Sequence, residues 1–158
     1  DLVVRHGNFV EFSGVNEEDD VAKCIAQKIL EYKNKGYKTI AVISKTDMMS
    51  NNINNKLSKL GINIPNVSVN DDPNDEKFRI CTISNQLAKG LEFDAVIIND
   101  ANEKVYDSDN ALDMKLLYVA VTRALHDLDI VYSGNLTKTL DDYTKCNNDN
   151  KSFDRCRK

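Results

Sequence analysis

Hydrophobic residues recur at helical spacing in three stretches of the chain. The first stretch begins after Asn16, which is a favourable residue at a helix N-terminus, and it ends at Gly36. The buried side of this predicted helix consists of Val21, Cys24, Ile25, Ile29 and Tyr32. Similar spacing predicts a second helix over about residues 46–60 and a third over about residues 113–125. In the second helix, the asparagines of the segment 51–55 are interpreted as a solvated face.

Short apolar runs between these stretches predict strands. Residues 39–43 form a continuous apolar run, which is typical of a strand that is buried on both faces of a parallel sheet. Further strands are predicted at 8–12, 78–83, 95–98 and 128–132, with a weak strand at 67–69. Because strands alternate with helices, we expect an α/β fold with three layers: a mainly parallel open sheet with helices on both faces.

The 158 residues are enough for one domain with a substantial core, and 41% of them are hydrophobic. We expect residues 1–134 to form this domain and residues 135–158 to be a polar tail that is partly disordered, because hydrophobic residues become sparse after Gly134. No apolar run approaches the roughly 20 residues that span a bilayer, so a membrane partner is not expected. The chain begins at Asp1 without a signal peptide, and we expect it to be a piece of a longer polypeptide.

The four cysteines are Cys24, Cys81, Cys146 and Cys156, and no two of them form a CxxC pair. The two histidines, His6 and His126, lie far from the cysteines in sequence, so a zinc site is not expected. Cys24 and Cys81 lie in apolar patterns and are interpreted as reduced core residues, which fits a cytoplasmic protein. The net charge of −4 argues against a protein that binds nucleic acid by its overall charge alone.

No glycine begins a phosphate-binding loop of the form GxxxxGK[ST], and there is no GxGxxG either. The chain is therefore not expected to hold the phosphates of a nucleotide by itself. Asp100 follows the apolar run 95–98 in the way that a Mg²⁺-binding acid follows a strand in many nucleotide hydrolases. Without a phosphate loop, we interpret Asp100 as a polar strand terminus.

Arg123 lies in an otherwise apolar stretch, 116–124, where a guanidinium needs a polar partner. One reading is a salt bridge to Asp127 or Asp129. The other is an arginine that faces a cleft and binds phosphate, for which its planar set of donors is well suited.

The segment Lys89-Gly90-Leu91-Glu92 precedes a predicted buried strand. Gly90 permits a positive φ or a close backbone approach, and Glu92 could accept hydrogen bonds from sugar hydroxyls. The same residues would also suit an ordinary solvated loop.

The segment Thr82–Asp94, which reads TISNQLAKGLEFD, resembles motif V of the superfamily 1 DNA helicases of the UvrD/Rep type. The segment Leu116–Ala124, LLYVAVTRA, resembles their motif VI. The segment 87–97, LAKGLEFDAVI, is most similar to the helicase IV (HelD-like) branch. The resemblance implies the second, C-terminal RecA-like motor domain of such an enzyme, a fold of the P-loop NTPase type that lacks its own phosphate loop.

In that family, ATP and Mg²⁺ bind between two RecA-like domains, and the first domain supplies the phosphate loop and the acid that holds the metal. The resemblance implies that Arg123 reaches the γ-phosphate and that Glu92 contacts the ribose, with Lys89 and Gly90 lining the same cleft. The DNA-backbone contacts of the family would correspond to Thr82, Ser84 and Asn85. No cofactor is then expected in this chain alone.

The sequence also departs from the family pattern. Many relatives have a histidine three residues before the motif V lysine, where this chain has Gln86. The expected function is the C-terminal motor domain of an ATP-dependent DNA helicase. Its partners would be single-stranded or partly duplex DNA and the N-terminal RecA-like domain of the same polypeptide. The alternative is a degenerate RecA-like module that serves as a non-catalytic binding or scaffolding domain.

Overall fold

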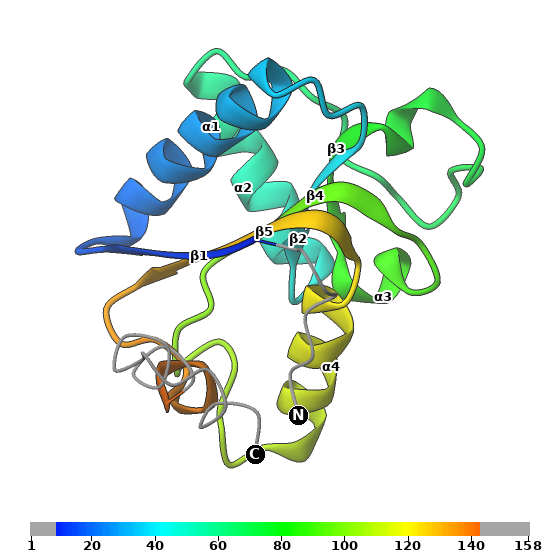
Figure 1. Ribbon diagram of the computed structural model, residues 1–158. Coiled ribbons are helices and arrows are strands. Elements are labelled where there is room, and N and C mark those ends of the chain that lie inside the picture. The colour runs from blue at the N-terminus through cyan, green and yellow to red at the C-terminus, as the bar shows by residue number, and fades with distance from the viewer. Residues whose placement is uncertain (1–8, 143–158) are drawn as a thin grey trace.

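The computed structural model describes residues 9–142 and shows a parallel sheet between two layers of helices (Figure 1). All pairs of neighbouring strands are parallel, and their order across the sheet is β1-β5-β4-β2-β3. The strands are β1 (Phe9–Val15), β2 (Ile40–Ser44), β3 (Ile80–Ser84), β4 (Phe93–Ile98) and β5 (Ala124–Ser133). The predicted three-layer α/β fold is confirmed, and the sheet is wholly parallel within the described residues.

The helices divide between the two faces of the sheet. They are α1 (Glu18–Asn34), α2 (Asp47–Lys59), the short α3 (Asn85–Ala88) and α4 (Ala111–Val121), with a 3-10 turn, η1, at Glu76–Phe78. Figure 1 shows α1 and α2 above the sheet and α4 below it. Residues of β4 alternate accordingly, because Ala95 and Ile97 pack in the core under α1 and α2, whereas Val96 and Ile98 pack in the core under α4.

Local sequence accounts for the ends of the first two helices. Acidic residues fill the first turn of α1, where the helix dipole favours negative charge, and Gly36 follows its end with φ +91°. The N-cap of α1 is Glu17 rather than the predicted Asn16, and it makes no side-chain capping bond. In α2, the Oγ1 of the N-cap residue Thr46 accepts a hydrogen bond from Met49 N at 3.1 Å.

The third predicted helix, 113–125, is too long at its C-terminal end. The structure ends α4 at Val121 and begins β5 at Ala124, so Arg123 lies between a helix and a strand. β-Branched residues in the last turn favour this early end, and Phe93 N donates to Arg123 O at 2.9 Å, which starts the pairing of β4 with β5. The predicted weak strand at 67–69 is also absent, apart from an isolated bridge between Asn66 and Thr82.

The packed body continues past the predicted boundary at residue 134. Leu136 and Leu140 are buried in the core under α4, and Thr137 donates a hydrogen bond from Oγ1 to Tyr106 O at 2.9 Å. The remainder of the predicted tail, 143–158, lies outside the described residues, as do His6, Cys146 and Cys156. Within residues 9–142, no helix is both long and apolar enough to cross a membrane.

Candidate functional site

The site residues predicted from the sequence lie at two opposite edges of the sheet. Because all strands run in one direction, residues that precede β4 and β5 share one edge, and residues that follow β3 share the other. Lys89, Gly90, Glu92 and Arg123 are at the first edge, whereas Ser84 and Asn85 are at the second.

The loop 89–92 joins α3 to β4 by a turn that needs glycine. Gly90 has φ +85°, as one of the two sequence-based interpretations required, and Leu91 N donates to Ala88 O at 3.0 Å. A Cβ atom at Gly90 would meet nothing within 4 Å, so the backbone conformation and not a close approach explains the glycine. Lys89, Gly90 and Glu92 are exposed.

Arg123 is half-buried and connects this loop to the end of α4. Its Nε donates to Val119 O at 3.1 Å and its Nη1 donates to Leu91 O at 3.3 Å. A third bond runs from Nη2 to Thr122 Oγ1 at 3.3 Å. The two motif segments that the sequence singled out therefore meet at this guanidinium.

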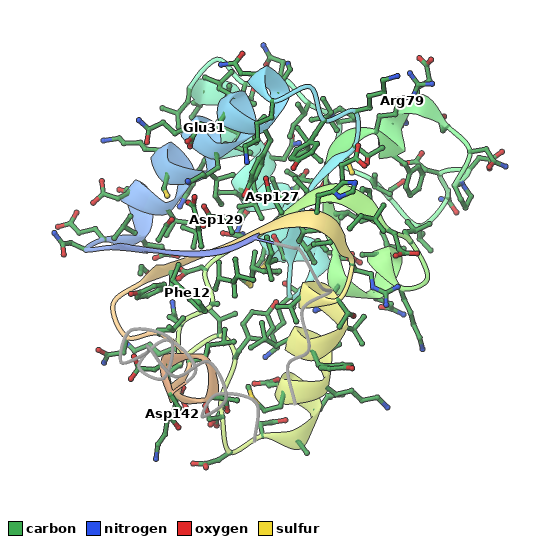
Figure 2. The ribbon with its side chains drawn as sticks, viewed as in Figure 1. Phe12, Glu31, Arg79, Asp127, Asp129 and Asp142 are labelled. Carbon is green, nitrogen blue, oxygen red and sulfur yellow. The ribbon has the colours of Figure 1, made fainter. Side chains whose placement is uncertain are left out.

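The alternative prediction, a salt bridge from Arg123 to Asp127 or Asp129, is wrong. Asp127 instead pairs with Lys35 at 2.7 Å and accepts from the hydroxyl of Tyr37 at 3.0 Å. Asp127 and Asp129 are two residues apart on β5, so their side chains point to the same face of the sheet, which α1 covers (Figure 2). Arg123 precedes β5 and is held instead by α4 and the loop 89–92.

The bonding of Arg123 leaves it able to bind an anion. A guanidinium has five N–H donors, and the three bonds above leave two of them for another acceptor. All three acceptors are neutral oxygens, and no carboxylate among residues 9–142 forms a salt bridge with Arg123. A half-buried, uncompensated guanidinium is a favourable place for a phosphate or carboxylate group.

The predicted DNA contacts, Thr82, Ser84 and Asn85, are all buried. Thr82 Oγ1 accepts from Asn54 Nδ2 and donates to Asn66 Oδ1, both at 2.9 Å. Asn54 was expected on the solvated face of α2, and its bond to Thr82 could not be predicted because α2 carries several similar asparagines.

Two oxygens at the end of β3 have no hydrogen-bond partner among the described residues: Ser84 Oγ and Asn85 Oδ1. The amide nitrogen of Asn85 is occupied, because Nδ2 donates to Leu116 O at 2.7 Å. The assignment of these residues and Thr82 to DNA contact stays a prediction. In the conformation described here, their side chains are covered by protein.

Asp100, interpreted from the sequence as a polar strand terminus, lies two residues after the end of β4. Its Oδ1 accepts from Ser133 N and from Asn102 Nδ2, each at 2.8 Å, and its Oδ2 accepts from Ser133 Oγ at 3.0 Å. Its φ of 58° is unusual for a residue with a side chain. Both carboxylate oxygens therefore serve to join the ends of β4 and β5.

The thiols and the acidic groups give no sign of a metal or a nucleophile. Cys24 and Cys81 are free thiols, and burial raises the pKa of Cys81 to about 12. Burial also raises the pKa of Cys24, so neither thiol is activated. Residues 9–142 contain no group of three or more His, Cys, Asp or Glu side chains that could hold a metal ion.

Comparisons with known proteins show what this arrangement is similar to. The model of the UvrD-like helicase C-terminal domain matches residues 79–131, which include the loop 89–92, α4 and Arg123. A crystal structure of the C-terminal domain of a possible DNA helicase from Lactobacillus plantarum WCFS1 is 27% identical, with a TM-score of 0.66, over 85% of this chain and 78% of that chain.

The helicase domain of Hef from Pyrococcus furiosus is less similar. It is 15% identical with a TM-score of 0.46, over 81% of this chain and 28% of that chain. A comparison with curated protein sequences gave no significant match. Residues 79–131 are therefore similar to the UvrD-like helicase C-terminal domain, and the chain has the α/β fold of the domain from Lactobacillus plantarum.

Proposed function

We propose that this chain is the C-terminal RecA-like motor domain of an ATP-dependent DNA helicase and that it supplies half of an ATP site. The observation that carries this proposal is the hydrogen bond from Arg123 Nη1 to Leu91 O, which holds the arginine against the loop 89–92. Both parts of the proposed half-site thus lie at one edge of the sheet, although 32 residues separate them in sequence.

The residues at this edge fit the polyphosphate and ribose of a nucleotide. The two remaining N–H groups of Arg123 would bind the γ-phosphate and stabilise charge that develops there during transfer. The exposed carboxylate of Glu92 would accept from ribose hydroxyls, with Lys89 and Gly90 beside it. ATP would supply the phosphoryl group that is transferred to water.

Another domain must hold most of this nucleotide. The chain has no phosphate loop, and within the described residues no acidic cluster suits Mg²⁺. The N-terminal RecA-like domain of a longer, cytoplasmic polypeptide would supply both. This chain alone should therefore not hydrolyse ATP.

We place the DNA track at the opposite edge, near Ser84 and Asn85. Ser84 Oγ, which has no hydrogen-bond partner among the described residues, supports a role for this strand end in binding a polar ligand. Because Ser84 and Asn85 are both buried, contact with single-stranded or partly duplex DNA requires the end of β3 to move. The sheet would then separate the nucleotide from the DNA, so that closure of one edge shifts the other along the strand.

A degenerate, non-catalytic RecA-like module is the second candidate. The burial of Thr82 and Asn85 favours it, because a protein that had lost its DNA track could keep these residues for packing alone. Such a module would bind a partner without hydrolysing ATP.

The test is DNA-stimulated ATP hydrolysis by the longer polypeptide with Arg123→Ala. We expect turnover to fall by roughly 10³-fold or more, which is the usual contribution of an arginine that contacts the transferred phosphoryl group. DNA binding should change little. Arg123→Lys should also be poorly active, because an ammonium has three donors in place of five, and three bonds to protein oxygens would leave none for phosphate.

Arg79→Ala is the matched control. Arg79 lies in the same family segment, but it is exposed and pairs only locally with Glu76 at 3.8 Å. Its loss should leave turnover unchanged. Normal turnover in Arg123→Ala would contradict the assignment of Arg123 to the ATP site. No ATP hydrolysis by the unmodified polypeptide would favour the non-catalytic module instead.

A further inference from the structure

Three aromatic rings lie in series at the edge of the sheet that also holds Arg123. Tyr32 and Tyr37 are in tilted contact, with ring centroids 5.9 Å apart. Tyr37 in turn stacks on His126, with centroids 5.8 Å apart and 12° between the ring planes. Tyr32 is buried, whereas 58% of the His126 side chain is exposed. The series therefore runs from the core to the surface, and it ends in an imidazole that has one face covered by Tyr37.

Tyr37 is fixed by contacts with β5 and with the end of α1. Its hydroxyl donates to Asp127 at 3.0 Å, and the ammonium of Lys35 lies 2.7 Å from the same carboxylate. That ammonium is also 5.8 Å from the centre of the Tyr37 ring, a distance typical of a cation–π contact. Because Asp127 is buried, the tyrosine ring has little freedom to turn away from His126.

The imidazole of His126 is oriented by a second carboxylate. Asp94 Oδ1 lies 3.9 Å from His126 Nε2. The other oxygen of Asp94 accepts from the backbone N–H groups of Lys38 and Thr39, at 3.1 and 3.2 Å. An exposed side chain ordinarily keeps its rotamer freedom, because fixing it costs conformational entropy. This ring is instead held at one face and at one nitrogen, and its other face is open to a ligand.

The surroundings of this ring favour a flat, uncharged group over a phosphate. The carboxylate of Asp94 faces the imidazole, and the lysine beside the stack, Lys35, is already paired with Asp127. An aromatic face binds planar rings by stacking, and every nucleobase has such a face. Because the imidazole is already held in place, it loses little further freedom when a ligand binds.

The stack lies close to the proposed half-site. Asp94 is the second residue of β4, directly after the loop 89–92, and His126 is three residues after Arg123. We propose that Tyr37 and His126 form a platform on which a nucleobase stacks. This inference rests on the proposed function for the class of ligand, because a free nucleotide and a single strand are the two sources of a base that such a domain meets.

NMR spectra of the 158-residue chain test the platform without relying on ATP hydrolysis. The imidazole signals of His126 should move upfield when ATP or oligothymidylate is added, because a base stacked on the open face shields the ring. Inorganic triphosphate and an abasic oligonucleotide carry the charges without the bases, and they should leave these signals in place. The His126→Ala spectrum assigns the signals, since the only other histidine of the chain is His6.

The two ligands distinguish the two sources of the base. A shift with ATP alone would identify the base of the nucleotide as the occupant, and a shift with oligothymidylate alone would identify a base of the single strand. Either result supports the platform. A His126 signal that stays in place with both ligands, or that moves equally with inorganic triphosphate, would overturn it.

Variants of His126 separate stacking from charge. His126→Ala should weaken binding of the ligand that shifts the signal by roughly tenfold, a typical contribution of one base stacked on an aromatic side chain. His126→Phe should keep most of the affinity, because it keeps a ring. His126→Lys should bind as weakly as the alanine variant, although it offers a positive charge.

Tyr118→Ala is the matched control. Tyr118 is 42% exposed and stacks on no other ring in the part of the chain that the structure describes. Its loss should leave the affinity unchanged. Unchanged affinity in His126→Ala, or an equal loss in Tyr118→Ala, would contradict the platform. Both side chains are exposed, so the melting temperature should change little in any of these variants.

Failure of the platform and failure of the motor give different results. Normal base binding by His126→Ala, together with turnover that depends on Arg123 in the longer polypeptide, would refute the platform alone. Base binding that depends on His126, in a longer polypeptide that does not hydrolyse ATP, would support the platform and refute the motor.

Discussion

Arg123 and Leu91 are joined by a hydrogen bond of 3.3 Å from the guanidinium to the backbone carbonyl. The backbone provides a second link, since Phe93 N donates to Arg123 O at 2.9 Å. The loop 89–92 and the end of α4 are thereby held to each other by both side chain and backbone. Movement of one segment would be transmitted directly to the other.

Arg123→Ala should change the stability of the isolated chain only slightly. The side chain makes three bonds to neutral oxygens at 3.1–3.3 Å, and each typically contributes about 1 kcal/mol or less in a half-exposed site. We expect a loss of about 1–2 kcal/mol in urea unfolding. A much larger loss would assign Arg123 a mainly structural role.

Gly90→Ala should destabilise the chain by about 1–2 kcal/mol, because alanine is strained at φ +85°. Gly36 provides a matched control, since its φ is +91° and a Cβ atom there also meets nothing within 4 Å. Gly36→Ala should therefore cost a similar free energy of unfolding. Only Gly90→Ala should also raise the KM for ATP in the longer polypeptide, because only Gly90 lies beside Arg123.

Regular packing could be predicted from the sequence, and the positions of polar side chains could not. The apolar run 39–43 gave a strand that is fully buried, and the helical spacing after Asn16 gave α1. The end of α4 was misplaced because apolar residues lie on both sides of Thr122 and Arg123, in the helix and in β5. Hydrophobicity alone does not mark the change of conformation at Thr122 and Arg123.

The partners of buried polar groups depend on which strands are neighbours. Asp129 and Glu11 are directly opposite each other because β1 pairs with β5, a relationship between the two ends of the described chain. The same holds for Thr82, whose partners come from α2 and the following loop. A sequence without its topology does not contain these pairings, so the candidate site needed both the motif resemblance and the structure.

Asp129 is fully buried in a charged cluster between β5 and α1 (Figure 2). Its Oδ2 lies 3.2 Å from Lys28 Nζ and accepts from Ser13 Oγ at 3.3 Å, while Oδ1 has no partner among the described residues. Lys28 also binds Glu11 and lies 3.3 Å from Glu31, so three carboxylates share one lysine. Burial raises the pKa of Asp129 from 3.8 to about 6, although Lys28 opposes this shift.

Stability should therefore fall as the pH rises from about 4 to about 6.5. The folded state keeps the proton of Asp129 after the unfolded state has lost it, so the stabilisation is complete below pH 3.8 and lost as the pH passes about 6. The difference between a pKa of 3.8 in the unfolded state and about 6 in the folded state corresponds to about 3 kcal/mol. Asp129→Asn should flatten this part of the pH profile of the free energy of unfolding. Asp127→Asn, on the same strand, should leave it in place, and an unchanged slope in Asp129→Asn would contradict the assignment.

Thr82→Val separates a structural role of the motif V strand from contact with DNA. The variant loses the bonds to Asn54 and Asn66, but Asn54 keeps its bond to Ile64 O and Asn66 keeps its bond from Ser50. We expect a loss of about 1–2 kcal/mol in the stability of the isolated chain. Thr139→Val, at an exposed threonine, should have no effect.

Because Thr82 is fully buried, its replacement by valine should leave the affinity of the folded longer polypeptide for a single-stranded oligonucleotide unchanged. Fluorescence anisotropy measures this affinity. Weaker DNA binding without any loss of stability would show instead that the end of β3 opens and that Thr82 reaches the DNA backbone.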